Sequence, residues 1–152
     1  MTVILNLDIT PKDLTQITDK QTRAVQSALP KAVLRVAGLG QQIIKQRTAK
    51  GRGINGVFPA YSPKYIEFRR EKLRKNDPTT VNLNATGQML VRSMQVKREG
   101  SRRAVIFFDN QQATNKANFN QRTRPFMGFN SKEKTRLQAR FTTDIKQAVA
   151  RA

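Results

Sequence analysis

An apolar stripe in the first third of the chain places the strongest constraint on the fold. Between residues 12 and 47, apolar or small side chains recur in steps of three and four, which is the spacing of one helix face. They are Val25, Leu29, Ala32, Val36, Leu39 and Ile43. Pro30 removes a backbone donor inside this stretch, and Gly38 and Gly40 weaken its far end. We therefore expect a long helix over residues 12–47, kinked or broken near residue 30, whose stripe packs on a core or on another subunit.

The remaining patterns predict an α+β domain. The predicted strands cover residues 2–9, 95–99 and 103–109, and the predicted helices cover residues 63–75, residues 86–94 and a final stretch capped by Ser131. Residues 124–129 are expected to form a short strand or an extended segment. This order favours a long N-terminal helix and a C-terminal helix packed on a small antiparallel sheet. At 152 residues the chain fits a single domain, residues 1–152.

Two connections in this domain are expected to be mobile or to become ordered only in an assembly. The first, at about residues 48–62, contains Gly51, Gly53 and Gly56, and glycine permits turns that most residues resist. The second, residues 110–123, is rich in asparagine and glutamine and should be a surface excursion or a short helix.

The formal net charge of +19 indicates that the partners are polyanions, acidic protein surfaces or an assembly that neutralises the charge. The cations concentrate in residues 45–75, which hold ten Lys and Arg against two acids, Glu67 and Glu71. In the predicted helix over residues 63–75, the apolar side chains, Phe68 among them, are expected to be buried and the cations exposed. The candidate contacts to a polyanion or an acidic partner are Lys45, Arg47, Lys50, Arg52, Arg69, Arg70 and Lys72. The alternative interpretation of this charge is an ordinary solvated surface.

The composition argues against an enzyme. The chain has no histidine and no cysteine, which removes the usual general base, the thiolate nucleophile and the commonest transition-metal ligands. The close carboxylate pair, Glu67 and Glu71, is interpreted as surface charge pairing, and the glycines do not match a phosphate-binding loop. We expect no catalytic residues, no cofactor and no metal. No stretch approaches the roughly 20 apolar residues of a membrane span, so a soluble protein is expected, without membrane contact.

Three segments together resemble a known family. They are RTAKGRGINGVFPAYSPKY (Arg47 to Tyr65), LNATGQMLVRSM (Leu83 to Met94) and RPFMGFNSKEK (Arg124 to Lys134). In this order they resemble the neck and tail-completion proteins of tailed bacteriophages, also described as virion morphogenesis or head-tail joining proteins. The resemblance spans roughly residues 12–150. The chain departs from the family pattern at Met127, where leucine is common, and in the amide-rich residues 110–123.

The resemblance implies a structural virion protein, assembled in the host cytoplasm, that forms a homo-oligomeric ring, commonly sixfold, between portal and tail. The implied partners are portal or adaptor proteins and tail-tube or terminator proteins, with non-specific contact to packaged DNA as an additional expectation. We expect the ring contacts to use exposed aromatic side chains beside cations. The candidates are Phe58, Tyr61, Arg124, Phe126 and Phe129. For the rings, the alternative is that they fill the core of the subunit. For the whole chain, the alternative is a stand-alone basic nucleic-acid-binding protein.

Overall fold

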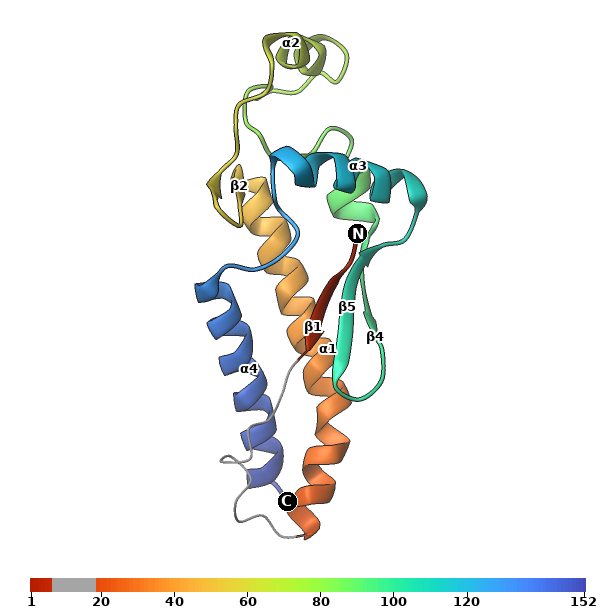
Figure 1. Ribbon diagram of the computed structural model, residues 1–152, viewed down its shortest axis with the longest axis vertical. Helices are drawn as coiled ribbons and strands as arrows, with labels where there is room; N and C mark the ends of the chain where they lie inside the picture. The colour runs from red at the N-terminus through yellow and green to blue at the C-terminus, as the bar shows by residue number, and fades with distance from the viewer. Residues whose placement is uncertain (7–18) are drawn as a thin grey trace.

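The computed structural model describes residues 1–6 and 19–152 and shows an elongated α+β molecule (Figure 1). The helices are α1 (Asp19–Ala49), α2 (Pro63–Glu71), α3 (Gln111–Thr123) and α4 (Ser131–Ala150), with a short π-helical turn, η2 (Gln88–Arg92). The strands are β1 (Val3–Asn6), β2 (Arg52–Gly53), β3 (Gly56–Val57), β4 (Met94–Arg98) and β5 (Arg103–Phe108). None of the helices in these described ranges is long and apolar enough to cross a membrane.

The two long helices and the larger sheet form what we call the body, together with α3. In Figure 1, α1 and α4 run side by side along the long axis, and the sheet lies against α1. The sheet is antiparallel, with strand order β1-β5-β4, and its central strand pairs Ile106 with both Val3 and Val96. The predicted α+β fold class is therefore confirmed, with α1 and α4 packed together with a small antiparallel three-stranded sheet.

The body has an apolar core, to which the predicted stripe contributes. Val33, Val36 and Ile44 of α1 are fully buried, and they share a hydrophobic cluster with Phe141 of α4 and Ile106 of β5. Burying an aliphatic or aromatic side chain of this size contributes about 1.5–3 kcal/mol. The amphipathic pattern alone therefore explains why α1 needs both α4 and the sheet.

Of the predicted kink or break near Pro30, the break is wrong, because α1 continues through Pro30 to Ala49; the kink stays a prediction. Proline inside a helix costs about 3 kcal/mol. Its neighbours Leu29 and Ala32 are both buried in the core, and this packing offsets the cost. The predicted helical residues 12–18 and strand residues 7–9 lie outside the described part of the chain.

Gly40 also has a packing role that the sequence pattern did not show. It is buried, and a Cβ added there would come within 2.8 Å of the Phe129 ring. Contacts this short are essentially never seen for a real Cβ, so glycine is what allows the ring to lie against α1.

Several boundaries differ from the predicted ones. The hairpin is confirmed as β4 and β5, but the helix predicted over residues 86–94 is the single turn η2, and residues 124–129 contain no strand. The amide-rich segment is the helix α3, whose N-cap Asn110 accepts a hydrogen bond from the Ala113 N–H at 2.8 Å. Asn130, not Ser131, caps α4 in a reciprocal capping box with Glu133. The mobility of residues 48–62 and 110–123 stays a prediction.

Candidate functional site

Residues 59–85 form a small lobe, the α2 lobe, that projects from one end of the body (Figure 1). Its helix begins where the sequence predicts: the Ser62 hydroxyl accepts a hydrogen bond from the Tyr65 N–H at 3.3 Å, and Pro63 occupies the first turn. In Figure 1, α2 stands apart from the other helices and strands, joined to the body by two chain segments. At its base, Val81 and Leu83 belong to the hydrophobic cluster of the body, while the part around α2 depends mainly on contacts within the lobe.

Aromatic rings run through the lobe from its base towards its tip. The rings of Tyr61 and Tyr65 meet edge to face with centroids 4.8 Å apart, and Tyr65 stacks on Phe68 at 5.9 Å. Edge-to-face and offset-stacked pairs are the geometries that aromatic quadrupoles favour. Phe68 is 45% exposed, so the prediction that it is buried is wrong, and the aromatic row ends in a ring open to solvent.

Arg69 is the buried centre of the lobe. Its side chain is 1% exposed, and its guanidinium donates hydrogen bonds to the Thr80 carbonyl at 2.8 Å and to Asn82 Oδ1 at 3.3 Å. The guanidinium carbon lies 4.7 Å from the centre of the Tyr61 ring, within cation-π range. The prediction that Arg69 contacts a polyanion from the surface is therefore corrected. Arg69 fastens the return segment of the lobe to its helix instead.

Arg124 and Tyr61 join the lobe to the body. The Arg124 guanidinium donates hydrogen bonds to the Pro59 carbonyl at 3.2 Å and the Ala60 carbonyl at 3.0 Å, and it lies 5.0 Å from the centre of the Tyr61 ring. The Tyr61 hydroxyl accepts a hydrogen bond from the Leu83 N–H at 3.2 Å. The outgoing and returning segments of the lobe therefore meet at this ring.

The pKa of Tyr61 reflects this environment. Burial raises the pKa of the phenol above its ordinary value, and the nearby guanidinium groups of Arg69 and Arg124 oppose that shift. The hydroxyl is protonated at neutral pH, as a phenol also is at its ordinary pKa of about 10. Tyr61 is thus an uncharged residue between the guanidinium groups of Arg69 and Arg124.

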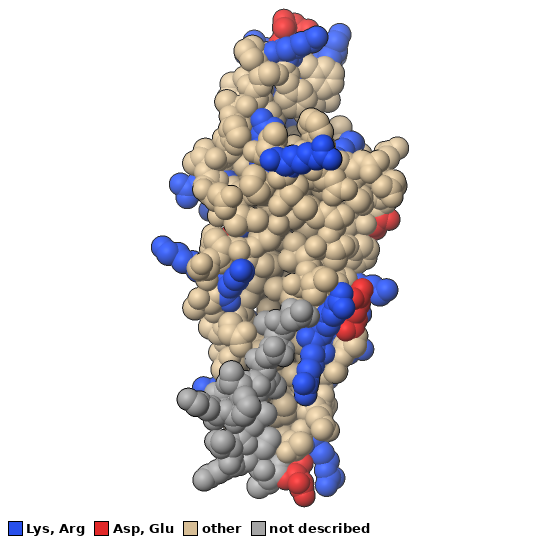
Figure 2. Space-filling model, in the orientation of Figure 1, with Lys and Arg blue, Asp and Glu red and all other residues tan. Residues whose placement is uncertain are grey.

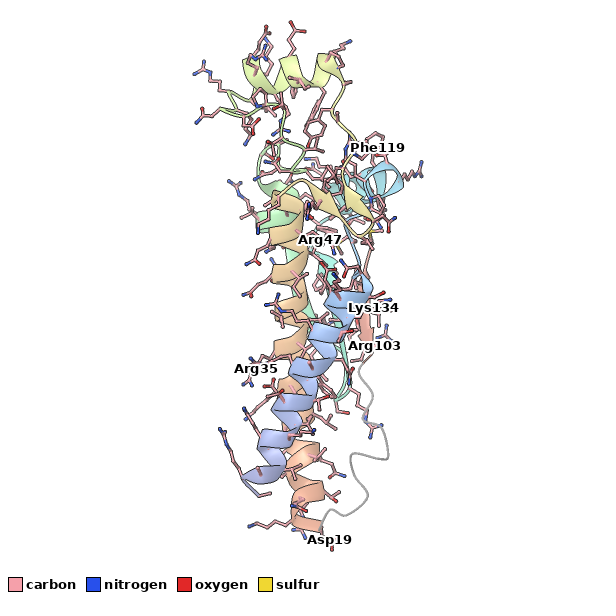
Figure 3. The ribbon with its side chains drawn as sticks, turned by 90° about the vertical axis from the view of Figure 1, so that its left-hand side faces the viewer. Asp19, Arg35, Arg47, Arg103, Phe119 and Lys134 are labelled. Atoms are coloured by element: carbon pink, nitrogen blue, oxygen red, sulfur yellow. The ribbon has the colours of Figure 1, made fainter. Side chains whose placement is uncertain are left out.

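Arg47 makes a second junction, inside the body. It forms an ion pair with the Glu133 carboxylate and donates to the Phe126 carbonyl at 2.6 Å and the Gly128 carbonyl at 3.1 Å. The Arg47 side chain, labelled in Figure 3, is only 9% exposed. Its prediction as a polyanion contact is therefore corrected as well. Arg47 ties the end of α1 to the loop before α4 and to the α4 capping box.

The glycine-rich loop at residues 51–56 also contacts the segment that precedes α4. The Ile54 N–H donates to the Pro125 carbonyl at 2.9 Å. A Cβ on Gly53 would come within 2.3 Å of that carbonyl oxygen, so only glycine permits this approach. Gly53 thus serves a close backbone contact within the subunit.

The structure separates the predicted interface residues into two groups. Phe58, Phe126 and Phe129 belong to the hydrophobic core with at most 9% of their surface exposed, so the expectation of exposed rings is wrong for these three. Tyr61 and Arg124 are half-buried at the base of the lobe. Phe126 is covered because it packs beside Phe108, with ring centroids 6.4 Å apart.

The exposed aromatic ring that the sequence analysis missed is Phe119, which is 71% exposed on α3. The signal was present in the spacing. Ala113 and Ala117 form the buried face of α3. Residue 119 lies two positions beyond Ala117, which turns it to the opposite side of a helix.

The other predicted cations remain available to solvent. Lys50, Arg52, Arg70 and Lys72 are exposed, while Lys45 is half-buried, and burial lowers the pKa of its amino group. Figure 2 shows Lys and Arg at the lobe, just below it, along the left edge and over the lower part of the molecule, around a central area of uncharged residues. The exposed charge is therefore spread around the margins of this face.

Asp77 organises the turn at the far side of the lobe. Its carboxylate accepts hydrogen bonds from the Thr79 and Thr80 N–H groups at 3.2 and 3.1 Å, and both threonine hydroxyls also donate to it. These bonds, those of Thr80 first, lower the pKa of Asp77 from 3.8 to about 2. The charged carboxylate thus holds the return segment in place.

The arrangement offers cationic, aromatic and hydrogen-bonding contacts. Within residues 1–6 and 19–152, no three carboxylates, histidines or cysteines gather as metal ligands. No protein-family model, no curated protein and no solved structure matches the chain.

Proposed function

We propose that this chain is a structural component of a tailed bacteriophage virion, a neck or tail-completion protein that forms a ring between the head and the tail. The observation that carries the proposal is the way the three family-like segments come together in space. Residues 47–65, 83–94 and 124–134 are far apart in sequence, yet they form one connected junction at the root of the α2 lobe.

Four residues donate the hydrogen bonds that build this junction. Arg47 donates to the Phe126 carbonyl, the Ile54 N–H to the Pro125 carbonyl, Arg124 to the Pro59 and Ala60 carbonyls, and the Leu83 N–H to the Tyr61 hydroxyl. Residues at the quoted motif positions therefore depend on one another. This supports treating the resemblance as one structural unit and not as three coincidental matches.

The shape and surface of the subunit are consistent with a building block. The α2 lobe projects from the body (Figure 1) and carries on α2 the ring of Phe68, which is 45% exposed, while Phe119 and Val57 are exposed at 71% and 76%. Large apolar side chains left open to water are typical of surfaces that meet a partner. The homo-oligomeric ring, its portal and tail neighbours and its place in the virion neck are all parts of this proposal.

Imaging of purified phage particles tests it. Electron microscopy with symmetry analysis should place the chain in a ring next to the portal, and mass spectrometry of the same particles should detect it in stoichiometric amounts. A particle preparation that lacks the chain would count decisively against a structural role.

A second candidate is a stand-alone protein that binds nucleic acid through phosphates, favoured by the net charge of +19 and the exposed Lys50, Arg52, Arg70 and Lys72. Such binding is sequence-blind and weakens steeply with salt. Fluorescence anisotropy with a duplex oligonucleotide measures it. This candidate requires tight, salt-sensitive binding by a chain that light scattering shows to be monomeric.

A further inference from the structure

A groove of about 650 Å³ lies between the base of the α2 lobe and α3. Its walls include Tyr61, Tyr65 and Met89 on one side and Lys116, Phe119 and Arg124 on the other. In Figure 3, Phe119 lies at the level where α3 meets the stem of the lobe. The groove therefore joins two of the predicted interface residues, Tyr61 and Arg124, to the most exposed aromatic ring among the described residues.

The charge of the groove has one sign. Lys116 and Arg124 line it, and among the residues that the structure describes no carboxylate does. Neither cation forms an ion pair within the described ranges. Lys116 donates to Gln88 Oε1 at 2.6 Å, and Arg124 donates to two backbone carbonyls, so both keep N–H groups for another acceptor.

The remaining walls are apolar or carry polar groups suited to a peptide backbone. The rings of Tyr61, Tyr65 and Phe119 offer apolar surface, while Asn120 and Gln88 offer amide donors and acceptors. Phe119 is 71% exposed at the margin, where an incoming side chain could cover it. An occupant that matches this surface has an apolar side chain flanked by carboxylates.

From this geometry we infer that the groove binds an acidic peptide segment of a neighbouring protein, with an aromatic or large aliphatic side chain against Tyr65 and Phe119 and carboxylates at Lys116 and Arg124. The inference rests on the proposed function for the source of the peptide, which is an adjacent protein of the particle. The charge pairing itself is independent of that source.

A nucleic acid fits the groove less well than a peptide. Stacking of bases needs open ring faces, but the ring of Tyr61 already has two guanidinium groups within 4.7 and 5.0 Å. Two cations in the groove also make few phosphate contacts, whereas Lys50, Arg52, Arg70 and Lys72 are exposed outside it. Charge complementarity and the apolar walls together favour the peptide.

The test is a selection of twelve-residue random peptides on the full chain, followed by affinity measurement on a synthesised, fluorescein-labelled peptide from the selected pool. We expect the selected peptides to place Asp or Glu within a few residues of Phe, Leu, Met or Trp. The peptide should bind Lys116→Glu and Phe119→Ala about tenfold more weakly than the unchanged chain. Both positions are exposed on α3, so neither substitution threatens the fold.

Matched controls separate the groove from general attraction to a basic protein. Lys134→Glu makes the same charge change on α4, and Val57→Ala removes an equally exposed apolar side chain from β3. Both lie outside the groove and should leave the affinity within about twofold. The inference is overturned if Lys134→Glu weakens binding as much as Lys116→Glu, or if the selected peptides are acidic without apolar residues.

Two further outcomes would overturn it in favour of another occupant. A labelled twelve-nucleotide single strand that binds tightly and loses affinity in the same groove variants would indicate a nucleic-acid site. Self-association that light scattering detects in the unchanged chain and not in Phe119→Ala would indicate a second copy. Groove-dependent peptide binding by a chain absent from virions would leave the inference standing while the proposed function failed.

Discussion

The body and the α2 lobe are stabilised by different interactions. In the body, the largest buried side chains are apolar, with Phe126 and Phe141 at most 1% exposed between the helices and the sheet. In the lobe, the most deeply buried side chain is a cation, Arg69, held by a carbonyl, an amide and an aromatic ring. The comparison teaches that the body can fold by burying apolar surface, whereas the lobe, beyond Val81 and Leu83 at its base, depends on a few directional contacts. A region of this second kind opens more easily and gains more from a partner.

The largest effect is expected from the body. Phe141→Ala removes a ring that is 1% exposed on α4 and leaves a cavity, which should lower the free energy of unfolding by about 3–5 kcal/mol. Urea denaturation followed by circular dichroism measures this loss. Phe119→Ala, the same change at an exposed position, should shift the unfolding free energy by less than about 0.5 kcal/mol. If the two substitutions lowered the free energy of unfolding equally, burial in the apolar core would not be what stabilises the body.

A smaller effect is expected where a polar junction supports the body. Arg47→Met leaves the Glu133 carboxylate and the carbonyls of Phe126 and Gly128 without their donor in a partly buried site. Removing one partner of a buried ion pair costs about 3 kcal/mol. A double-mutant cycle with Glu133→Gln, measured by urea denaturation, isolates the pair. Arg52→Met is the matched control at an exposed position, and a comparable loss there would contradict the junction.

In the lobe, the effect should be local. Arg69→Met removes two hydrogen bonds and the contact with Tyr61, which should lower the opening free energy of residues 59–85 by about 1–2 kcal/mol. Hydrogen exchange by mass spectrometry should show roughly 5–30-fold faster exchange there, with the body unchanged. The neighbouring Arg70→Met, at an exposed site, should leave exchange unaffected. If Arg69→Met instead lowers the stability of the whole chain, the body and the lobe are one cooperative unit.

The smallest effect is a pH dependence confined to the turn of the lobe. The pKa of Asp77 is lowered from 3.8 to about 2, so the folded turn favours the charged carboxylate. Its stabilising contribution is complete above the unfolded pKa and is lost as the pH falls from about 4 to about 2. The amide NMR signals of Thr79 and Thr80 should therefore titrate in that window. In Asp77→Asn these signals should be independent of pH over the same range, and titration that persists would assign the effect to another group.

The sequence predicted the body well because its signals are periodic. The stripe of α1 and the apolar residues of α4 repeat at helical spacing, and the β4–β5 hairpin is centred on a Gly100 turn. Such patterns depend on which side of an element faces the core, and they do not depend on the details of tertiary contacts. The uninterrupted helix at Pro30 is the exception, because packing on both sides of the proline outweighs a local preference.

The candidate site was predicted only in part, because its residues are placed by long-range contacts. From the neighbouring sequence alone, the charges of Arg47 and Arg69 favour exposed positions. Carbonyls and a carboxylate from distant segments make the burial of these two side chains possible. Phe58, Phe126 and Phe129 were expected to be exposed because they are close to cations in sequence, but in space they face the core. Tyr61 and Arg124 lie half-buried at the base of the lobe, where their role as interface residues stays a prediction, and the groove that they share with Phe119 could not be read from spacing alone.

The Tyr61 hydroxyl and the Leu83 N–H, 3.2 Å apart, show that the polypeptide leaves and re-enters the body at nearly one place. A segment inserted at a single point can be lengthened, shortened or exchanged without rerouting the chain on either side of it. The α2 lobe is therefore a segment that can be exchanged by engineering or in the course of evolution. Related scaffolds could acquire new attachment partners by swapping this insert while α1, α4 and the sheet remain as they are.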